Sequence, residues 1–152
     1  LTHRRWLEEA GPTLHVHPGK RERIEVLEGA YRVRVAGTER TLAAGESAEI
    51  PPGARHAHWN PTDRPARIAV EHHPAKHSAE VFEALYRAAQ AGGALRNGLP
   101  HPLQLAVISA TYPGVVYTAW LPVGLQKLLN RLAAPGARLL GYRARPDELG
   151  PG

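Results

Sequence analysis

Residues 11–29 read GPTLHVHPGKRERIEVLEG, and they place His15 and His17 shortly before Glu22. Side chains two residues apart on a strand point to the same face, so the two imidazoles share one side. The proline and glycine at 18–19 favour a bend that brings the chain back and presents the carboxylate beside the rings. Imidazole nitrogens and carboxylate oxygens are common ligands of divalent metals. This stretch therefore predicts three ligands of a metal ion.

A second stretch, residues 45–60, reads GESAEIPPGARHAHWN. His56 lies on a predicted later strand and is the candidate for a fourth ligand. His58 follows two residues on and shares its face. We consider four roles for His58, namely support of a ligand, general base, substrate contact, or a histidine at the rim without a chemical role. The catalytic prediction uses it as the base.

Together the two stretches resemble the two signature motifs of the cupin superfamily. In the first motif, G-x5-H-x-H-x3/4-E-x6-G, we assign Gly11, His15, His17, Glu22 and Gly29. The second motif, G-x5-P-x-G-x2-H-x3-N, is assigned to Gly45, Pro51, Gly53, His56 and Asn60. We count ten fixed positions at fixed spacing, which are far more specific than a lone His-x-His pair.

The resemblance implies an all-β fold, the cupin double-stranded β-helix or jelly-roll barrel, of the small quercetin-dioxygenase-like type. It implies one divalent transition metal, Fe, Mn, Ni, Co or Zn, held by His15, His17, Glu22 and His56. Small cupins with this ligand set include dioxygenases, isomerases and polyketide cyclases. We therefore expect a metal-dependent, oxygenase-like enzyme for a small, largely apolar organic molecule. The alternative is a non-catalytic cupin that binds a small molecule or a metal and whose C-terminal tail attaches it to a partner or a membrane.

The spacing of turn residues supports a β architecture independently. Glycines recur every eight residues, at positions 29, 37, 45 and 53, with short β-rich runs between them. Residues 31–35 alternate strictly between apolar side chains and arginine, as a half-buried strand does. Ile24 and Val26 have the parity of Glu22, and His72 has that of two apolar neighbours on a later strand. We expect these three residues to line a substrate pocket beside the metal.

The predicted organisation is a barrel domain, residues 1–74, with an edge strand in residues 1–14, followed by a helical extension, residues 75–152. Ser78 is the expected N-cap of a first helix that ends at Gly92-Gly93. A second helix should start near Pro102 and stop before Pro113-Gly114. The third is expected from Pro122 to Ala134, with Pro135-Gly136 as its end. Its apolar face would carry four leucines, Leu125, Leu128, Leu129 and Leu132.

Residues 97–126 contain no Asp, Glu, Lys or Arg, which is long enough for a bilayer span. Several prolines and glycines interrupt this segment, so we expect it to pack on the barrel or across a dimer interface. Attachment to a membrane surface is the second alternative, and a true span is the third. Exposed barrel edges and this apolar segment together predict a homodimer.

The amino-acid composition excludes several other classes of protein. The 152 residues suffice for one domain with a real core, and the absence of cysteine excludes disulfides and thiolate metal ligands. A net charge of +5 raises the question of nucleic acid, but acids and bases are interspersed and there is one Phe. We therefore expect no nucleic-acid partner. The sequence opens without a secretion signal pattern, which favours a cytoplasmic protein.

Overall fold

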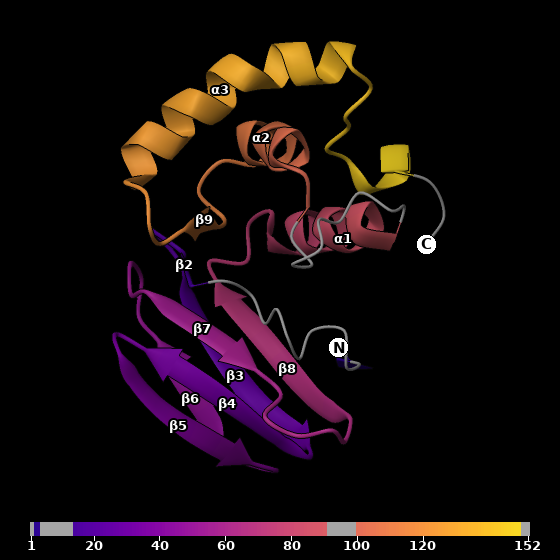
Figure 1. Cartoon of the computed structure of the whole chain (residues 1–152). Coiled ribbons are helices and arrows are strands. Elements are labelled where there is room, and N and C mark those ends of the chain that lie inside the picture. Colours follow the sequence, from indigo (N-terminus) through magenta and orange to yellow (C-terminus); the bar gives the residue numbers. More distant parts are fainter. Residues whose placement is uncertain (1, 4–13, 91–99, 150–152) are drawn as a thin grey trace.

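The computed structural model describes residues 2–3, 14–90 and 100–149. Its strands are β1 (Thr2–His3), β2 (His15–Val16), β3 (Arg21–Glu28), β4 (Ala30–Val35), β5 (Thr38–Ala43), β6 (Ser47–Ile50), β7 (His56–Trp59), β8 (Ala66–His73) and β9 (Tyr117–Thr118). They form two antiparallel sheets, with the orders β1-β8-β3-β6 and β5-β4-β7-β2-β9 (Figure 1). No ladder of hydrogen bonds joins the two sheets within the described ranges.

The glycine interval marks the turns of the sheets. Gly29, Gly37, Gly45 and Gly53 all have positive φ, between 78° and 91°. At Gly29 a Cβ atom would stand 3.1 Å from the carbonyl oxygen of Pro65, so a side chain is excluded by sterics as well as by φ. The strict alternation of β4 is confirmed, because Tyr31 and Val33 are buried and the arginines between the apolar positions are not.

The sheet core follows the alternation of the strands. On β3, Ile24 and Val26 are completely buried and point to the same side as Glu22. They pack in one cluster with aliphatic and aromatic side chains of the neighbouring strands, namely Tyr31, Val33, Leu42, Ala48, Ile50, Ala66 and Ile68. Alternation therefore places the apolar core and the carboxylate of Glu22 on the same interior face.

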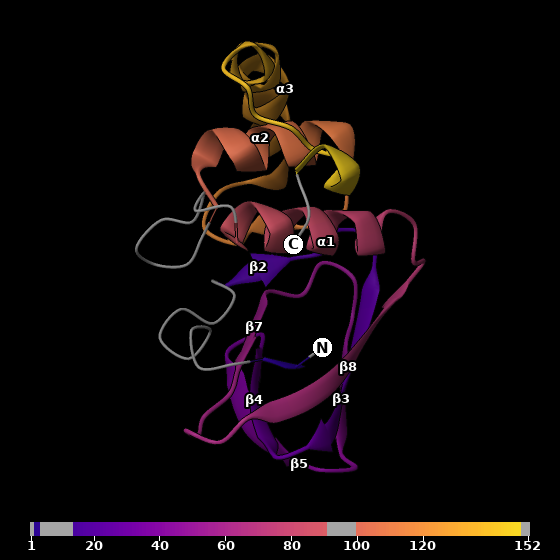
Figure 2. The same cartoon turned by 90° about the vertical axis from the view of Figure 1, so that its right-hand side faces the viewer.

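The helices lie beyond one end of the two sheets and stack in layers (Figures 1 and 2). They are α1 (Ser78–Ala88), α2 (Pro102–Thr111), α3 (Val123–Leu139) and the short 3-10 helix η3 (Pro146–Leu149). Helix α1 lies nearest the sheets and α3 farthest, with α2 between them. A second buried cluster holds them together, formed by Val81, Ala84, Val107, Ile108, Val115, Ala134, Ala137 and Ala144.

The expectation that Ser78 caps α1 is wrong. The N-cap is His77, which has a left-handed conformation with φ 61°, and no side chain caps the helix. Ser78 is the first helical residue, and its buried hydroxyl has no hydrogen-bond partner. The expected start and end of α2 are confirmed. The glycine stop expected for α1 lies outside the described residues.

The predicted end of the third helix is also wrong, because α3 continues through Pro135 and Gly136 to Leu139. Ala134 and Ala137, on either side of the proline, are both buried in the helical cluster, and this packing offsets the lost backbone hydrogen bond. The helix stops at Gly141, whose φ of 95° and whose N–H bond to the carbonyl of Arg138 form a left-handed C-terminal cap.

The leucines of α3 do not form its buried face. Leu125, Leu128, Leu129 and Leu132 are 43 to 70% exposed, and Leu139 and Leu140 are more exposed still. The face that packs inward carries Gln126, Ala134 and Ala137 instead. Small side chains let α3 approach α2 closely, and the larger leucines are left outside.

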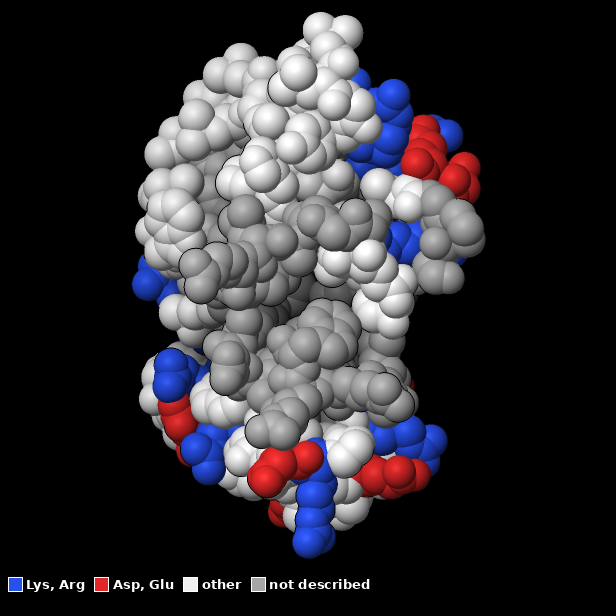
Figure 3. All heavy atoms as spheres, turned by 45° about the vertical axis from the view of Figure 1, so that its right-hand side comes forward, with Lys and Arg blue, Asp and Glu red and all other residues white. Residues whose placement is uncertain are grey.

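The chain is mixed α and β by content, because the predicted β-sheets are followed by helices, as expected; closure of the sheets into a barrel is not seen among the described residues. Part of the expected N-terminal edge strand is seen as β1, which pairs with β8, while residues 4–13 lie outside the described residues. None of the described helices has the length and apolar character needed to cross a bilayer. On the face in Figure 3, acidic and basic side chains alternate over the sheets, and uncharged atoms dominate over the helices.

Candidate metal centre

The four predicted ligands converge at the end of the sheets that faces the helices. His15 lies on β2 and His17 directly after it, Glu22 is on β3, and His56 opens β7. Register pairs His15 with His56 on neighbouring strands. All four side chains are buried, and one ligand atom from each lies within 4.8 Å of the others.

The spacing of these atoms fits one metal ion. Glu22 Oε2 lies 2.8 Å from His56 Nε2 and 3.2 Å from His17 Nε2. Ligands about 2.1 Å from an ion stand roughly 3 Å apart when they occupy adjacent positions. These same three atoms are buried and have no hydrogen-bond partner. Buried polar atoms without partners are costly and rare, so the cluster is consistent with a single metal ion that satisfies them.

Backbone carbonyls fix the tautomers of two ligands. His17 Nδ1 donates to the carbonyl of Val115, and His56 Nδ1 donates to the carbonyl of Ala54 at 2.9 Å. A carbonyl oxygen can only accept, so each Nδ1 carries the proton and each Nε2 turns a lone pair toward Glu22. Metal-ligating histidines are typically held in this way.

The charge states of the cluster suit metal binding. Burial by itself would raise the pKa of Glu22, but the ring nitrogens of His17, His56 and His72, which face its carboxylate, hold that pKa far below its usual range. Burial, followed by the neighbouring histidines, lowers the pKa of His15 well below its usual value of 6.5. At neutral pH the centre therefore offers a carboxylate and a neutral imidazole, which are the forms that bind metals.

The hydrogen bond between His17 and the carbonyl of Val115 was not predicted from the sequence. Val115 precedes β9, which pairs with β2 and so extends the metal-bearing sheet with a strand from the helical part of the chain. The buried side chain of Gln126 on α3 fixes β9. Its Oε1 accepts from the N–H and hydroxyl of Thr118, and its Nε2 donates to the carbonyls of Thr118 and Leu121. The one sequence signal was a glutamine at a helical position within an uncharged segment.

Two further predicted residues also reach the centre. His58 is buried, with Nδ1 3.1 Å from the hydroxyl of Tyr31 and Nε2 3.8 Å from Glu22 Oε1. His72 has a buried Nε2 without a hydrogen-bond partner, 3.7 Å from Glu22 Oε2. Its ring stacks flat on that of Phe82 in α1, with 5.3 Å between centroids. The structure therefore surrounds one carboxylate with five histidines.

The predicted substrate pocket is not seen directly. Ile24 and Val26 are packed in the sheet core with no exposed surface. The two pockets that the structure describes are lined by other residues, one around Lys20 and one between α2 and the segment after α3. A substrate cavity lined by Ile24, Val26 and His72 stays a prediction.

The other histidines lie away from the centre. His73 is exposed, and His77 lies at ion-pair distance, 3.5 Å, from Glu80. His101 accepts a hydrogen bond from the N–H of Leu103 at the start of α2.

The assignment of Gly11 to the first motif was wrong. The pattern needs five residues between its leading glycine and the first histidine, and this sequence has three between Gly11 and His15. Gly11 also lies outside the described residues. The remaining nine motif positions keep their spacing.

Comparison with known proteins agrees with these motifs. The cupin domain model matches residues 7–81. Similar solved structures include the TT1209 protein of Thermus thermophilus, with 36% identity, 41% of this chain and 60% of that chain covered, and a TM-score of 0.39. A sugar phosphate isomerase from a cupin superfamily of Silicibacter pomeroyi has 29% identity, coverages of 45% and 44%, and a TM-score of 0.39.

A cupin-2 domain containing protein of Shewanella frigidimarina has 23% identity, coverages of 46% and 62%, and a TM-score of 0.39. The chain thus spans less than two thirds of each of these three proteins. No curated protein matches it. The domain match covers every candidate ligand, and residues 7–81 of the chain are a domain of the cupin superfamily.

Proposed function

We propose that His15, His17, Glu22 and His56 bind one divalent transition metal, and that the protein is an oxygenase-like enzyme for a small, largely apolar organic molecule. The observation that carries the metal proposal is the set of buried, unpartnered ligand atoms around Glu22 Oε2. Nitrogen and oxygen ligands of this kind suit Fe, Mn, Ni, Co or Zn. When bound, such an ion would supply Lewis-acid chemistry and, if it is redox-active, chemistry with dioxygen.

His58 is the proposed base. Its Nδ1–H would donate to the hydroxyl of Tyr31, which leaves a lone pair on Nε2 beside the centre. Burial, and then the charge of Glu22, raise the pKa of Tyr31, so this hydroxyl stays neutral. His58 Nε2 would accept a proton from an acidic C–H or a phenol of the substrate, and the hydroxyl oxygen of Tyr31 would stabilise the resulting imidazolium.

A non-catalytic metal-binding or small-molecule-binding cupin is the second candidate. The observation that favours it is the packing of Ile24 and Val26, which are fully buried among other core side chains. A catalytic centre needs room for a substrate beside the metal. The two candidates thus differ in whether a substrate reaches His58.

The first experiment is metal analysis of protein expressed in medium that contains all five metals, followed by dioxygen consumption with quercetin as the probe substrate. An enzyme should bind about one ion per chain and consume dioxygen. His58→Ala should keep the metal and lose turnover. Stoichiometric metal without turnover would favour the binding protein, and the absence of metal would contradict the metal proposal and leave only a small-molecule-binding cupin.

We also propose that the two sheets form the jelly-roll barrel of residues 1–74, and that residues 75–152 act as an extension that covers its metal-bearing end. The support is a shared interior, since side chains of both sheets pack in one cluster. The helices have a separate cluster of their own. They reach the metal centre through β9 and Phe82.

A homodimer through α3 is a further proposal. The leucine face, defined as Leu125, Leu128, Leu129, Leu132, Leu139 and Leu140, is 43 to 90% exposed, and Trp120 is 77% exposed. Patches beyond roughly 300–600 Å² are unusual on a monomer, and about 800 Å² per partner makes a standard interface. Sedimentation should give a dimer that L128E/L132E dissociates. A monomer that binds lipid vesicles would favour membrane attachment instead.

A further inference from the structure

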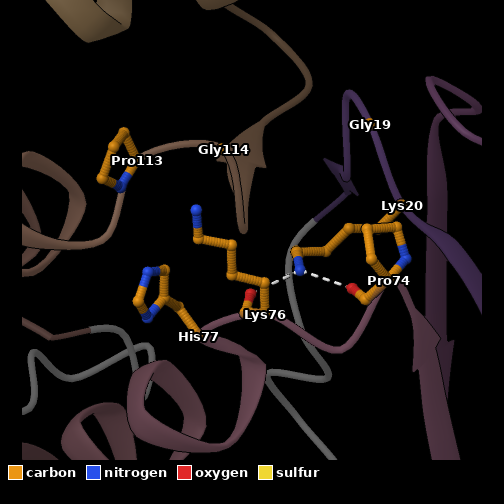
Figure 4. A pocket seen from close by; sticks show the side chains of 7 residues that line it. All are labelled: Gly19, Lys20, Pro74, Lys76, His77, Pro113 and Gly114. Carbon is orange, nitrogen blue, oxygen red and sulfur yellow. Dashed lines mark hydrogen bonds between the residues drawn. The ribbon is translucent and has the colours of Figure 1, made fainter.

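A pocket of about 230 Å³ opens where three segments of the chain meet (Figure 4). One wall is the turn that contains Gly19 and Lys20, just after the metal ligand His17. The second is the loop from Pro74 to His77 that leads into α1, and the third is the turn at Pro113-Gly114. The pocket thus lies between the sheets and the helices, outside the ligand cluster.

Lys20 is a buried cation in this pocket, with only 5% of its surface exposed. Its Nζ donates to the carbonyls of Pro74, at 2.7 Å, and Lys76, at 2.6 Å. An ammonium has three donors, so one remains. Among the described residues no carboxylate lies within ion-pair distance of Lys20. A buried charge without a counter-ion is costly, and a bound anion would reduce that cost.

The other polar side chains of the pocket add to its positive charge. The Lys76 side chain extends into the pocket toward Gly114, with the ring of His77 beside it (Figure 4). The lining contains no Asp or Glu. The exposed carboxylate of Glu80, which is not part of the lining, lies 3.5 Å from His77 Nδ1.

The glycines of the lining leave space for a ligand. A Cβ added at Gly19 or at Gly114 would meet no atom within 4 Å, so both positions border open volume. Gly114 has a φ of 86°, which a side chain would strain. Two cationic groups, an imidazole and accessible backbone together form a site that can bind a compact anion.

We propose that this pocket binds a small oxyanion, a phosphate or a carboxylate group, between Lys20, Lys76 and His77. The proposal does not rest on the catalytic function proposed above. The lining nevertheless adjoins the metal centre, because Gly19 lies two residues after His17, and Gly114 precedes Val115, which holds the ring of His17. An anion bound here would contact two segments that position one ligand.

The test is a titration of metal-loaded protein with inorganic phosphate and, separately, with malonate, at an ionic strength held constant with sodium chloride. Amide NMR spectra should show saturable shifts at Gly19 and Gly114 and none at Gly37, which lies in the turn between β4 and β5. Lys76→Ala should weaken binding about tenfold, as expected for one charge-assisted hydrogen bond. Lys76 is exposed, so this variant should fold.

The matched control is Arg131→Ala, which removes one positive charge from an exposed position on α3, and it should leave the affinity unchanged. Tighter binding of phosphate than of malonate would identify a phosphate site, and the reverse would identify a carboxylate site. Either result supports the proposal if Lys76→Ala weakens the binding of that anion. The proposal is overturned if neither anion saturates. It is equally overturned if Lys76→Ala binds as the wild type does, or if the shifts appear only at the metal ligands.

Discussion

The sheets and the helical layer bury their apolar surface in different ways. In the sheets, alternating strands turn large side chains such as Tyr31, Leu42 and Ile50 inward until they are 1% exposed. In the helical layer, α3 turns Ala134 and Ala137 inward and leaves the leucine face outside. Residue size therefore predicts burial in the first region and fails in the second, because close approach of two helices selects small side chains.

The two regions also differ in how they contribute to the metal centre. The sheets supply the ligand atoms, from β2, the turn after it, β3 and β7. The helical layer supplies support, through the carbonyl of Val115, which accepts from His17, and Phe82, which stacks on His72. Changes in the sheets should thus remove the metal, whereas changes in the helical layer should weaken its binding.

The largest expected effect is loss of metal on replacement of a ligand in the sheets. His56→Ala should lower metal affinity by more than the 10–100-fold that is typical of changes to supporting groups. The apolar sheet core does not depend on this ring, so the variant should stay folded. Metal content measured by mass spectrometry, with circular dichroism as a check of folding, tests this.

His73→Ala is the control for His56→Ala, since His73 is an exposed histidine at the end of β8. It should keep full metal content. Equal metal content in the two variants would mean that the ligand set is wrong.

Two separate glycine-to-alanine substitutions, one in each region, should change the free energy of unfolding in opposite directions. Gly29→Ala puts a side chain at φ 82°, with its Cβ 3.1 Å from the Pro65 oxygen, and should lower the free energy of unfolding by about 3 kcal/mol. Gly136→Ala lies inside α3 with open space around the new Cβ, and it should raise the same free energy by about 0.5–1 kcal/mol. Urea denaturation measures both, and a shared sign would contradict the comparison.

The burial pattern of the sheets could be predicted from the sequence better than that of the helices, for a physical reason. A strand repeats every two residues, so the positions of Glu22, Ile24 and Val26 on one face follow from counting alone. The cupin motifs then added His56 across a loop. On α3 the sequence predicted that the leucines are buried, but packing against the partner helix buries Ala134 and Ala137 instead. A pattern in one segment carries no information on that partner.

The groups that hold the histidines of the metal centre in place could not be predicted from the sequence, for the same reason. His17 Nδ1 bonds to a carbonyl 98 residues further along the chain, and every residue has such a carbonyl. Nothing in the side chain of Val115 marks it as a partner. Tyr31, by contrast, was predicted on a half-buried strand, yet its bond to His58 needed the register between β4 and β7.

A smaller effect is expected when the support in the helical layer is loosened. Gln126→Ala removes four hydrogen bonds that hold β9, and the carbonyl of Val115 just before that strand orients His17. Metal affinity should fall about tenfold, at the low end for supporting groups. Competition with a chromophoric chelator measures it. Arg131→Ala, at an exposed position of α3, is the control and should bind metal as the wild type does.

The smallest effect is expected on the leucine face of α3. Leu132 is 70% exposed, so Leu132→Ala should change the unfolding free energy of the monomer by less than about 0.5 kcal/mol. Two residues further on, Ala134 is 1% exposed, and Ala134→Leu should cost about 1–3 kcal/mol by overpacking. The more hydrophobic variant would be the less stable one.

Measurements at low protein concentration isolate the monomer, because a dimer through this face would make Leu132→Ala more costly as the concentration rises. A large cost for Leu132→Ala at every concentration would mean that the leucines are buried within one chain.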